Sequence, residues 1–395
     1  MEHYNPIFSK VPTLRFAEFT DEWEKYELSH FVTRITRRNK NNKSSLPLTI
    51  SAQYGLVDQI SFFNKTVASV DLSGYYLLYN GDFAYNKSYS NDYAWGAVKR
   101  LDKYEKGCLS SLYFVFRPND NVDSDYLTHY FESSKWHKGI SNIAGEGARN
   151  HGLLNMSVDD YFATKHCLPS LPEQKKIARF FNAITRRIEI QNKIIEDLKI
   201  LKKELCNKVF SKGTAVRLGE LIEEVTVRNK SNACDNVLSV SNKMGFIKQS
   251  EQFEDRTIAS ENKSNYKVVT KGCFAYNPAR INVGSIALLS SHSVGIISPM
   301  YVCFKAKNVL DSTYLSFYYQ SNFFARELQK KLEGSVRQCL TYENMRETII
   351  PYVDIERQRE IATTLNRITM LIATEEKCLK ALQKQKSYFL NAMFI

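Results

Sequence analysis

The chain has 395 residues, of which 43% are hydrophobic and 12% aromatic, and its formal net charge is +12. This length exceeds one ordinary domain, so we expect two hydrophobic cores. No apolar run approaches membrane-spanning length, and the first residues lack the basic and apolar regions of a signal peptide, which predicts a cytoplasmic protein. The excess of basic residues indicates an anionic partner. Nucleic acid is the first candidate, and a basic protein without such a partner is the alternative.

The first predicted domain, residues 1–170, combines short strands with short helices. Runs of β-branched and aromatic residues at 75–78 and 112–116 are separated by Gly, Asn, Asp and Ser clusters, a pattern typical of strands. A short helix is expected at residues 126–133. The sequence therefore predicts a β-rich globular domain of mixed class.

Three segments of this domain are candidate DNA contacts. Lysine and arginine neutralise phosphates, and asparagine and arginine match the donors and acceptors of base edges. A solvated loop or an ordinary structural turn is the alternative for each segment. The basic segment contributes Arg37, Arg38, Asn39, Lys40 and Lys43; a Gly-x-Phe-Ala turn is followed by Tyr85, Asn86 and Lys87; a glycine-rich loop carries Arg149.

Residues 171–213 predict a long helix that begins after two prolines and stops at Gly213. Its apolar residues alternate at spacings of three and four, which is the seam of a coiled coil. Two polar residues interrupt this seam. The predicted seam residues are Ile188, Gln191, Ile195, Leu198, Lys202 and Leu205.

The second half of the chain repeats the first. Residues 35–40 return at 225–230, and residues 81–86 return at 272–277, which predicts a second β-rich domain over residues 214–352. Its candidate DNA contacts are the copies of those in the first domain, together with a loop arginine. They are Arg228, Asn229, Lys230, Tyr276, Asn277, Arg280 and Arg337.

A second long helix, residues 353–395, repeats the seam and its polar interruptions. Its seam residues are Ile372, Glu375, Leu379, Leu382 and Lys386. Parallel pairing would place Lys202 beside Lys386, whereas one antiparallel register places Lys202 against Glu375 and Gln191 against Lys386. We therefore predict antiparallel pairing; the alternative is that these polar residues lie at solvated ends of a loose seam.

These elements together predict an α+β fold with pseudo-twofold symmetry, in which two β-rich domains are held apart by an antiparallel two-helix coiled coil. Each seam extends about 50 Å at 1.5 Å per residue, which corresponds to roughly 15 base pairs.

No catalytic or metal-binding motif is complete in the sequence. Asn277-Pro278-Ala279-Arg280 lacks the second proline and the aromatic residue of the adenine methyltransferase motif. The eight cysteines form no CxxC pair, and the seven histidines show no HExxH spacing. We therefore expect reduced thiols, no metal, no cofactor bound by this chain, and a binding protein rather than an enzyme.

Two sets of motifs resemble the specificity subunit of type I restriction–modification systems. Residues 12–16 followed by Trp23-Glu24 resemble the opening of that subunit, and residues 168–178 resemble the entry into its conserved helix. Residues 349–351 with 358–362 resemble the second copy, although Arg357 stands where a glutamate is usual.

The resemblance implies two target recognition domains that read the halves of a split, asymmetric DNA site. It also implies two modification subunits that methylate adenine from S-adenosylmethionine, and restriction subunits that use ATP and Mg. Two alternatives remain open, an RNA-binding factor with a coiled-coil arm and a non-catalytic assembly scaffold. The recognised bases, the spacer length and the helix faces that bind the modification subunits do not follow from the sequence.

Overall fold

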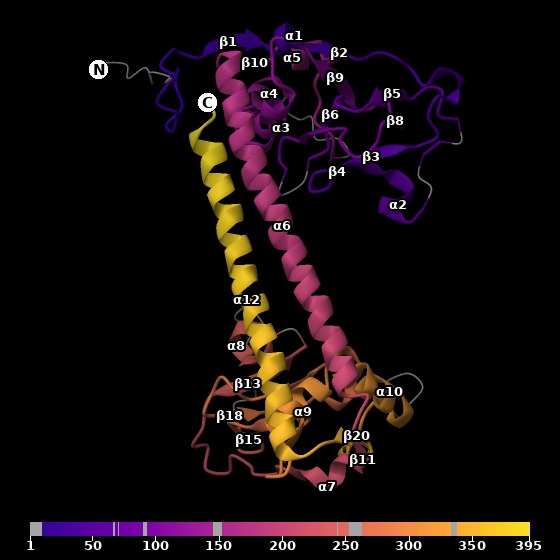
Figure 1. The fold of residues 1–395 in the computed structure, drawn as a ribbon, viewed down its shortest axis with the longest axis vertical. Coiled ribbons are helices and arrows are strands. Elements are labelled where there is room, and N and C mark those ends of the chain that lie inside the picture. The colour runs from indigo at the N-terminus through magenta and orange to yellow at the C-terminus, as the bar shows by residue number, and fades with distance from the viewer. Residues whose placement is uncertain are drawn as a thin grey trace. The chain divides into compact units, whose positions relative to one another are not determined.

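The computed structural model describes residues 10–65, 68–69, 71–89, 93–144, 152–242, 244–252, 263–332 and 338–395. The chain forms two compact units. Unit 1 comprises Met1–Gln191 with Cys378–Ile395, and unit 2 comprises Asn192–Lys377. Each of the two long helices contributes one part to each unit (Figure 1).

Unit 1 is built on a four-stranded antiparallel sheet in the order β2-β9-β6-β7 and three two-stranded pairs. The sheet contains β2 (Val32–Arg34), β9 (Phe114–Pro118), β6 (Phe83–Asn86) and β7 (Ala97–Arg100). The pairs are β1 (Glu24–Glu27) with β10 (Lys165–Leu168), β3 (Leu48–Ser51) with β4 (Gly55–Asp58), and β5 (Tyr76–Tyr79) with β8 (Lys106–Leu109). Its shorter helices are α1 (Leu28–Phe31), η1 (Lys40–Asn42), α2 (Gln59–Phe63), α3 (Ser124–Glu132), α4 (His137–Ile143) and α5 (Val158–Phe162).

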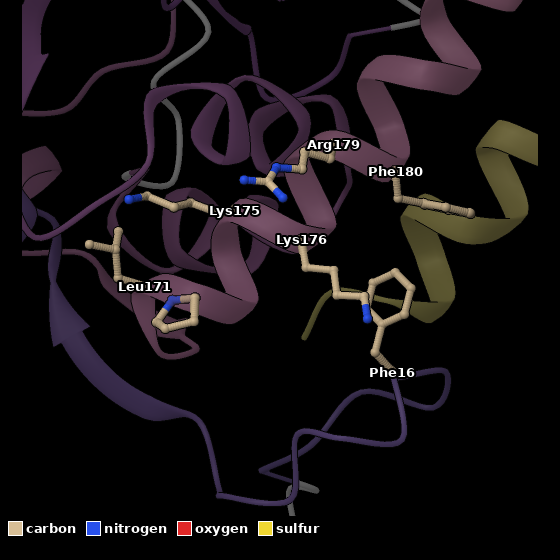
Figure 2. A pocket seen from close by; sticks show the side chains of 7 residues that line it. Phe16, Leu171, Lys175, Lys176, Arg179 and Phe180 are labelled. Atoms are coloured by element: carbon tan, nitrogen blue, oxygen red, sulfur yellow. The ribbon is translucent and has the colours of Figure 1, made fainter.

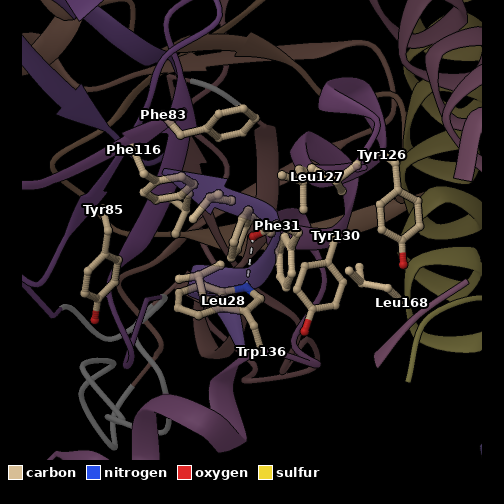
Figure 3. Close-up of a cluster of buried hydrophobic side chains, with 14 of the residues drawn as sticks. Leu28, Phe31, Phe83, Tyr85, Phe116, Tyr126, Leu127, Tyr130, Trp136 and Leu168 are labelled. Atoms are coloured by element: carbon tan, nitrogen blue, oxygen red, sulfur yellow. Dashed lines mark hydrogen bonds between the residues drawn. The ribbon is translucent and has the colours of Figure 1, made fainter. Parts of the chain in front are cut away.

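The aromatic residues of unit 1 form its main core, because the strands are too short to bury much surface with aliphatic side chains alone. Phe83 and Phe116 come from neighbouring strands and stack with ring centroids 5.5 Å apart. Figure 3 shows these rings together with Phe31, Tyr130 and Trp136, which are also buried. Aromatic pairs in such offset arrangements stabilise a core beyond their buried area.

Unit 2 repeats this plan. Its sheet β12-β19-β16-β17 has the strand order of the unit 1 sheet, and Phe274 stacks on Phe304 at 5.2 Å as Phe83 does on Phe116. The sheet contains β12 (Ile222–Glu224), β19 (Val302–Ala306), β16 (Cys273–Tyr276) and β17 (Ile286–Leu288). A second sheet contains β14 (Gly245–Lys248), β13 (Val237–Ser241), β18 (Val294–Ile297) and β15 (Lys267–Thr270), and β11 (Thr214–Arg217) pairs with β20 (Ile349–Tyr352). The shorter helices are α7 (Leu218–Leu221), α8 (Gln249–Gln252), η3 (Pro278–Val283), α9 (Ser312–Tyr318), α10 (Asn322–Lys331) and α11 (Tyr342–Arg346).

The two long helices are α6 (Leu171–Val209) and α12 (Ile355–Ala392). In unit 1, Phe180 near the start of α6 contacts Phe389 near the end of α12, with ring centroids 5.0 Å apart. In unit 2, Cys206 near the end of α6 shares a core with Leu365 near the start of α12. The predicted antiparallel pairing is therefore confirmed within each unit.

The polar residues of the seam do not compensate one another in the predicted register. Lys202 donates to Gln320 Oε1 at 3.2 Å and lies over the ring of Phe317. Lys386 pairs with Glu132 of α3 at 2.9 Å. Each lysine is thus accommodated by the globular part beside it, because long lysine side chains reach past the helix seam. Across the helices, Lys199 pairs instead with Glu376 at 2.6 Å.

The residues that follow α12 belong to the core of unit 1. Met393 and Phe394 are buried, and Phe394 stacks on Phe181 of α6 at 5.5 Å and contacts Tyr126 of α3 at 5.4 Å. Of the helices in the described ranges, none combines the length and the apolar character needed to cross a membrane.

Candidate nucleic-acid interface

A buried glutamine fastens each long helix to its globular part. Gln174 Oε1 accepts the backbone N–H of Asp123 at 2.8 Å, and its Nε2 donates to the carbonyl of Pro169 at 2.9 Å. Gln358 makes the same contacts with Asp311 and Val353, each at 2.8 Å. Both contacted aspartates cap the helix that follows them. We call this arrangement the glutamine latch; it gives the repeated Gln-x-x-Ile-Ala motif a structural role.

The repeated basic segment is shaped by a buried asparagine in each unit. Asn39 donates to the carbonyl of Ser44 at 2.8 Å and accepts its N–H at 3.0 Å, and Asn229 makes the same pair with Cys234. Both asparagines are buried. This placement gives Asn39 and Asn229 a loop-closing role and argues against direct base contact, contrary to the reason for which they were selected from the sequence.

The arginines of the same segment differ in their freedom to bind phosphate. Arg37 is held by the buried carboxylate of Asp82, which also accepts from Arg117 at 2.7 Å. Burial raises the pKa of Asp82, and the backbone N–H of Tyr79 and the two guanidinium groups oppose that rise. Arg37 therefore has a structural partner within unit 1.

Arg38 and its copy Arg228 lie at the surface, where each donates to a backbone carbonyl of its own domain. Arg38 donates to the Gly74 carbonyl at 2.7 Å and lies over the Tyr76 ring at 4.3 Å. Arg228 donates to the Asn265 carbonyl at 2.7 Å. The lysines beside them are exposed and make no ion pair with a described residue; these are Lys40, Lys43 and Lys230.

The tyrosines that follow the Gly-x-Phe-Ala turns are core residues. Tyr85 is fully buried, stacks on Tyr161 at 4.7 Å and donates to the Trp95 carbonyl at 2.9 Å. Tyr276 is equally buried. Burial raises the pKa of both phenols well above the usual value. Neither side chain is placed to touch DNA, because the turn directs it inward, so these two candidates are corrected to core positions.

The residues next to these tyrosines are more accessible. Asn86 is half-buried and accepts the N–H of Ser88, whereas Asn277 caps η3 through the N–H of Ala279 at 3.1 Å. Lys87 is half-buried and lies 5.4 Å from the ring centre of Phe114. Arg280 is exposed on η3. Arg149 and Arg337 lie outside the described residues.

A groove of about 740 Å³ opens at the start of α6, where residues of the chain's first segment pack on the helix. Arg15 binds the buried Glu173 carboxylate through two hydrogen bonds of 2.7 and 2.8 Å. Figure 2 shows Lys176 extending over the ring of Phe16. The groove is lined by Phe16, Leu171, Pro172, Lys175, Lys176, Arg179 and Phe180.

An exposed apolar cluster in unit 1 was not predicted from the sequence. It comprises Tyr54 in the β3–β4 turn and three residues of α2, and we call it the α2 patch: Tyr54, Ile60, Phe62 and Phe63. A helix of five residues is too short to show a helical period, so its apolar residues could not be assigned to an exposed face. Within the described residues, no group of three or more His, Cys, Asp or Glu could hold a metal ion.

Comparison with known proteins identifies relatives of both units. A family model described as a type I restriction modification DNA specificity domain matches residues 214–384. The protein assigned as the MjaX type I restriction enzyme specificity subunit of Methanocaldococcus jannaschii is 22% identical over 95% of this chain and 94% of its own length. The MjaVIII type I restriction enzyme specificity subunit of the same organism is 24% identical over 73% of this chain and 74% of its own.

Two solved structures share the fold. The S subunit of a type I restriction–modification system from M. genitalium is 15% identical with a TM-score of 0.55, covering 98% of this chain and 99% of that one. A chain from a study of complex assembly and conformational transition in a type I system is 18% identical with a TM-score of 0.53, covering 93% and 96%.

Proposed function

We propose that the chain is a specificity subunit of a type I restriction–modification system and recognises a bipartite, asymmetric site in duplex DNA, because its second half matches the specificity-domain model and its relatives carry that name. Each unit would read one half-site. The observation that carries this proposal is the glutamine latch, which fastens two domains of the same fold to an antiparallel helix pair in the same way. Two readers with a common anchor and different surfaces suit a site with two different halves.

The spacing of the half-sites is proposed to follow from the helix pair. A helix of 39 residues, the length of α6, extends about 58 Å at 1.5 Å per residue. That length is compatible with half-sites about one turn of DNA apart. The sequences of the half-sites would be set by side chains on the two units.

The exposed cations are proposed to bind the DNA backbone. Lys40, Lys43 and Arg38 in unit 1, and Lys230 and Arg280 in unit 2, are exposed and would neutralise phosphates. Buried Asn39 and Asn229 would instead hold the loops that present these cations.

Partner subunits would supply the chemistry. We propose that two modification subunits methylate adenine with S-adenosylmethionine, and that restriction subunits use ATP and Mg²⁺, with this chain contributing sequence recognition in the cytoplasm. The match to the specificity-domain model and the likeness to a specificity subunit support this division of labour.

The decisive experiment maps methylated adenines in cells with and without this gene, with the partner subunits present in both. The expected result is that one bipartite adenine motif disappears on deletion. If every adenine motif persisted, the proposed function would be wrong.

A domain exchange tests the assignment of half-sites. Replacing residues 214–352 by those of a relative is expected to change one half of the motif, and the reciprocal exchange of residues 1–170 is expected to change the other half. A change of both halves by a single exchange would contradict the assignment of one half-site to each unit.

Phosphate contact is tested by salt dependence. Replacing Lys40 and Lys43 by glutamine is expected to reduce the slope of log K against log salt by about one for each lost contact, whereas the charge-matched control Lys384→Gln on α12 leaves it unchanged. If the slope of log K against log salt were the same for all three lysine variants, Lys40 and Lys43 would not be phosphate contacts.

A further inference from the structure

The α2 patch is an unusual surface for a basic domain. Tyr54 is 60% exposed, Ile60 43%, and Phe62 and Phe63 are each 44% exposed, and no residue of α2 is buried. Single exposed apolar residues are ordinary, but a contiguous group of large ones indicates a contact surface. Four such residues within ten positions form a group of this kind.

The patch has a defined geometry. Asp58 caps α2 by accepting the N–H of Ile60 at 3.0 Å, and the N–H of Gln59 donates to the carbonyl of Pro47 at 2.9 Å. The ring of Phe62 lies 6.4 Å from that of Tyr54 and 5.0 Å from that of Phe63. These bonds fix the N-terminal end of the short helix, and the ring contacts hold Phe62 beside Tyr54 and Phe63.

The charge of the chain segment that contains the patch indicates which kind of partner covers it. Residues 34–65 contain six lysines or arginines and one acidic residue. That residue, Asp58, caps α2. Within the part of the chain that the structure describes, Arg37 is the one cation of this segment that pairs with a carboxylate, that of Asp82. An apolar patch in a strongly cationic segment of the chain matches duplex DNA, whose phosphates are anionic and whose major groove displays thymine methyl groups.

Unit 2 has a different sequence at the equivalent place. Residues 224–255 contain four lysines or arginines and five acidic residues. Ser250 and Gln252 stand where unit 1 has Ile60 and Phe62. Met244 and Phe253 stand where unit 1 has Tyr54 and Phe63, so the residues specific to unit 1 are Ile60, Phe62 and the excess of positive charge.

We propose that the α2 patch contacts thymine methyl groups in the half-site that unit 1 reads, with Lys40, Lys43 and Lys65 on the flanking phosphates. This inference rests on the proposed function and deepens it. Phenylalanine and other apolar side chains recognise the thymine methyl because contact removes both groups from water. A half-site that contains a methylated adenine has at least one thymine opposite it, so the contact is available in every such site.

The test replaces thymine by uracil, which removes only the methyl group. The probe is duplex DNA carrying the adenine motif lost on deletion of the gene, with each thymine of the two half-sites replaced in turn. The protein is the full chain in complex with its modification subunits. Wild-type complex is expected to lose about fourfold in affinity for at least one uracil in a single half-site, the loss expected for one buried methyl group.

Two variants complete the cycle. The double variant Ile60→Ser with Phe62→Gln gives unit 1 the residues of unit 2 at these two positions. It is expected to bind the thymine-containing duplex more weakly than wild type and to show no further loss when uracil replaces thymine. The slope of log K against log salt is expected to be unchanged. Leu112→Ser, which alters a residue 62% exposed elsewhere in unit 1, is expected to keep the wild-type response to uracil.

The outcomes separate this inference from the proposed function. Absence of any motif-specific binding by the wild-type complex would contradict the proposed function. Specific binding in which the double variant keeps the wild-type affinity and uracil response would overturn only the role of the α2 patch. Failure of the double variant to assemble with the modification subunits, with normal uracil sensitivity in the complex that remains, would identify the patch as a protein contact and also overturn the inference.

Discussion

At residue 173 unit 1 has a buried glutamate, whereas unit 2 has the exposed Arg357 at the equivalent position. The next residue in both units is the latch glutamine, and its hydrogen bonds are the same. A similar contrast occurs in the sheets, where the buried Asp82 of unit 1 is replaced by the buried Cys273 of unit 2. The comparison teaches that the two units share the bonds that position their helices but not their buried charges.

The largest expected effect comes from removing the partner of the buried glutamate. Arg15→Ala leaves the Glu173 carboxylate buried without its bidentate partner and is expected to destabilise unit 1 by about 3–5 kcal/mol. The matched control is Arg357→Ala in unit 2, whose side chain pairs at the surface with Glu360 and whose loss is expected to be undetectable. Urea unfolding followed by amide exchange in each unit measures the loss of stability in both variants. Equal losses would contradict the view that the buried ion pair stabilises unit 1 more than the surface pair stabilises unit 2.

Acid is expected to weaken unit 1 through His166, for which unit 2 has Ile350. Burial lowers the pKa of His166 to about 4, with the charge of Lys25 acting in the same direction. The unfolded chain binds this proton below about pH 6.5, so the stabilisation is complete above that pH. It is lost as pH falls towards 4, by an amount on the order of 3 kcal/mol.

The measurement is the free energy of unfolding of unit 1 between pH 7 and 4. His166→Ile, which copies unit 2, is expected to flatten the dependence between pH 6.5 and 4, while Tyr130 loses its hydrogen bond to the ring. A second loss is expected below pH 4.5 from Glu132, because burial opposes its ionisation but hydrogen bonds from His129 and Lys386 lower its pKa to about 2. If the stability of His166→Ile depended on pH between 6.5 and 4 as steeply as that of wild type, the assignment of this loss to His166 would be wrong.

The latch is expected to contribute equally in the two units. Gln174→Ala and Gln358→Ala each leave a partly buried backbone N–H of an aspartate without its acceptor, and each is expected to cost about 1–3 kcal/mol in its own unit. Local amide exchange at the start of α6 and of α12 reads the two effects separately. If one of the two substitutions left the stability of its unit unchanged, the same hydrogen-bond geometry would not contribute the same stability in both units.

The smallest expected effect is at the surface of the helix pair in unit 2. Lys199 and Glu376 are 55% and 45% exposed, so Glu376→Gln is expected to cost less than about 1 kcal/mol and to have no effect in 1 M salt. Thermal unfolding at low and high salt measures this. A cost that persists in 1 M salt would show that the pair is more shielded than its exposure indicates.

The parts of the fold that the sequence predicts are those that depend on periodicity and repetition. The seam spacing predicted both long helices, and the repeats predicted two similar β-rich domains. Antiparallel pairing was predicted from polar seam residues that would compensate one another; the direction is confirmed, but that compensation is not what the structure shows. The exact partners of Lys202 and Lys386 could not be predicted, because each reaches a residue of a globular part that no helical period specifies.

The candidate site was predicted less well for a physical reason. Repetition identifies residues that both units need, and these include residues that build loops and cores as well as residues that contact a ligand. Asn39, Asn229, Tyr85 and Tyr276 recur because each closes a loop or fills a core. The α2 patch was missed for the opposite reason, since Ile60 and Phe62 have polar counterparts in unit 2 and repetition cannot reveal them.

The burial of Met393 and Phe394 in unit 1 has a consequence for biosynthesis. Unit 2 is one continuous stretch of chain, whereas unit 1 needs residues 378–395 to complete the core that its first 191 residues begin. During translation the first domain to emerge therefore waits for residues made almost four hundred codons after its start. Until they leave the ribosome, the rings of Tyr126 and Phe181 remain open to solvent or to a chaperone.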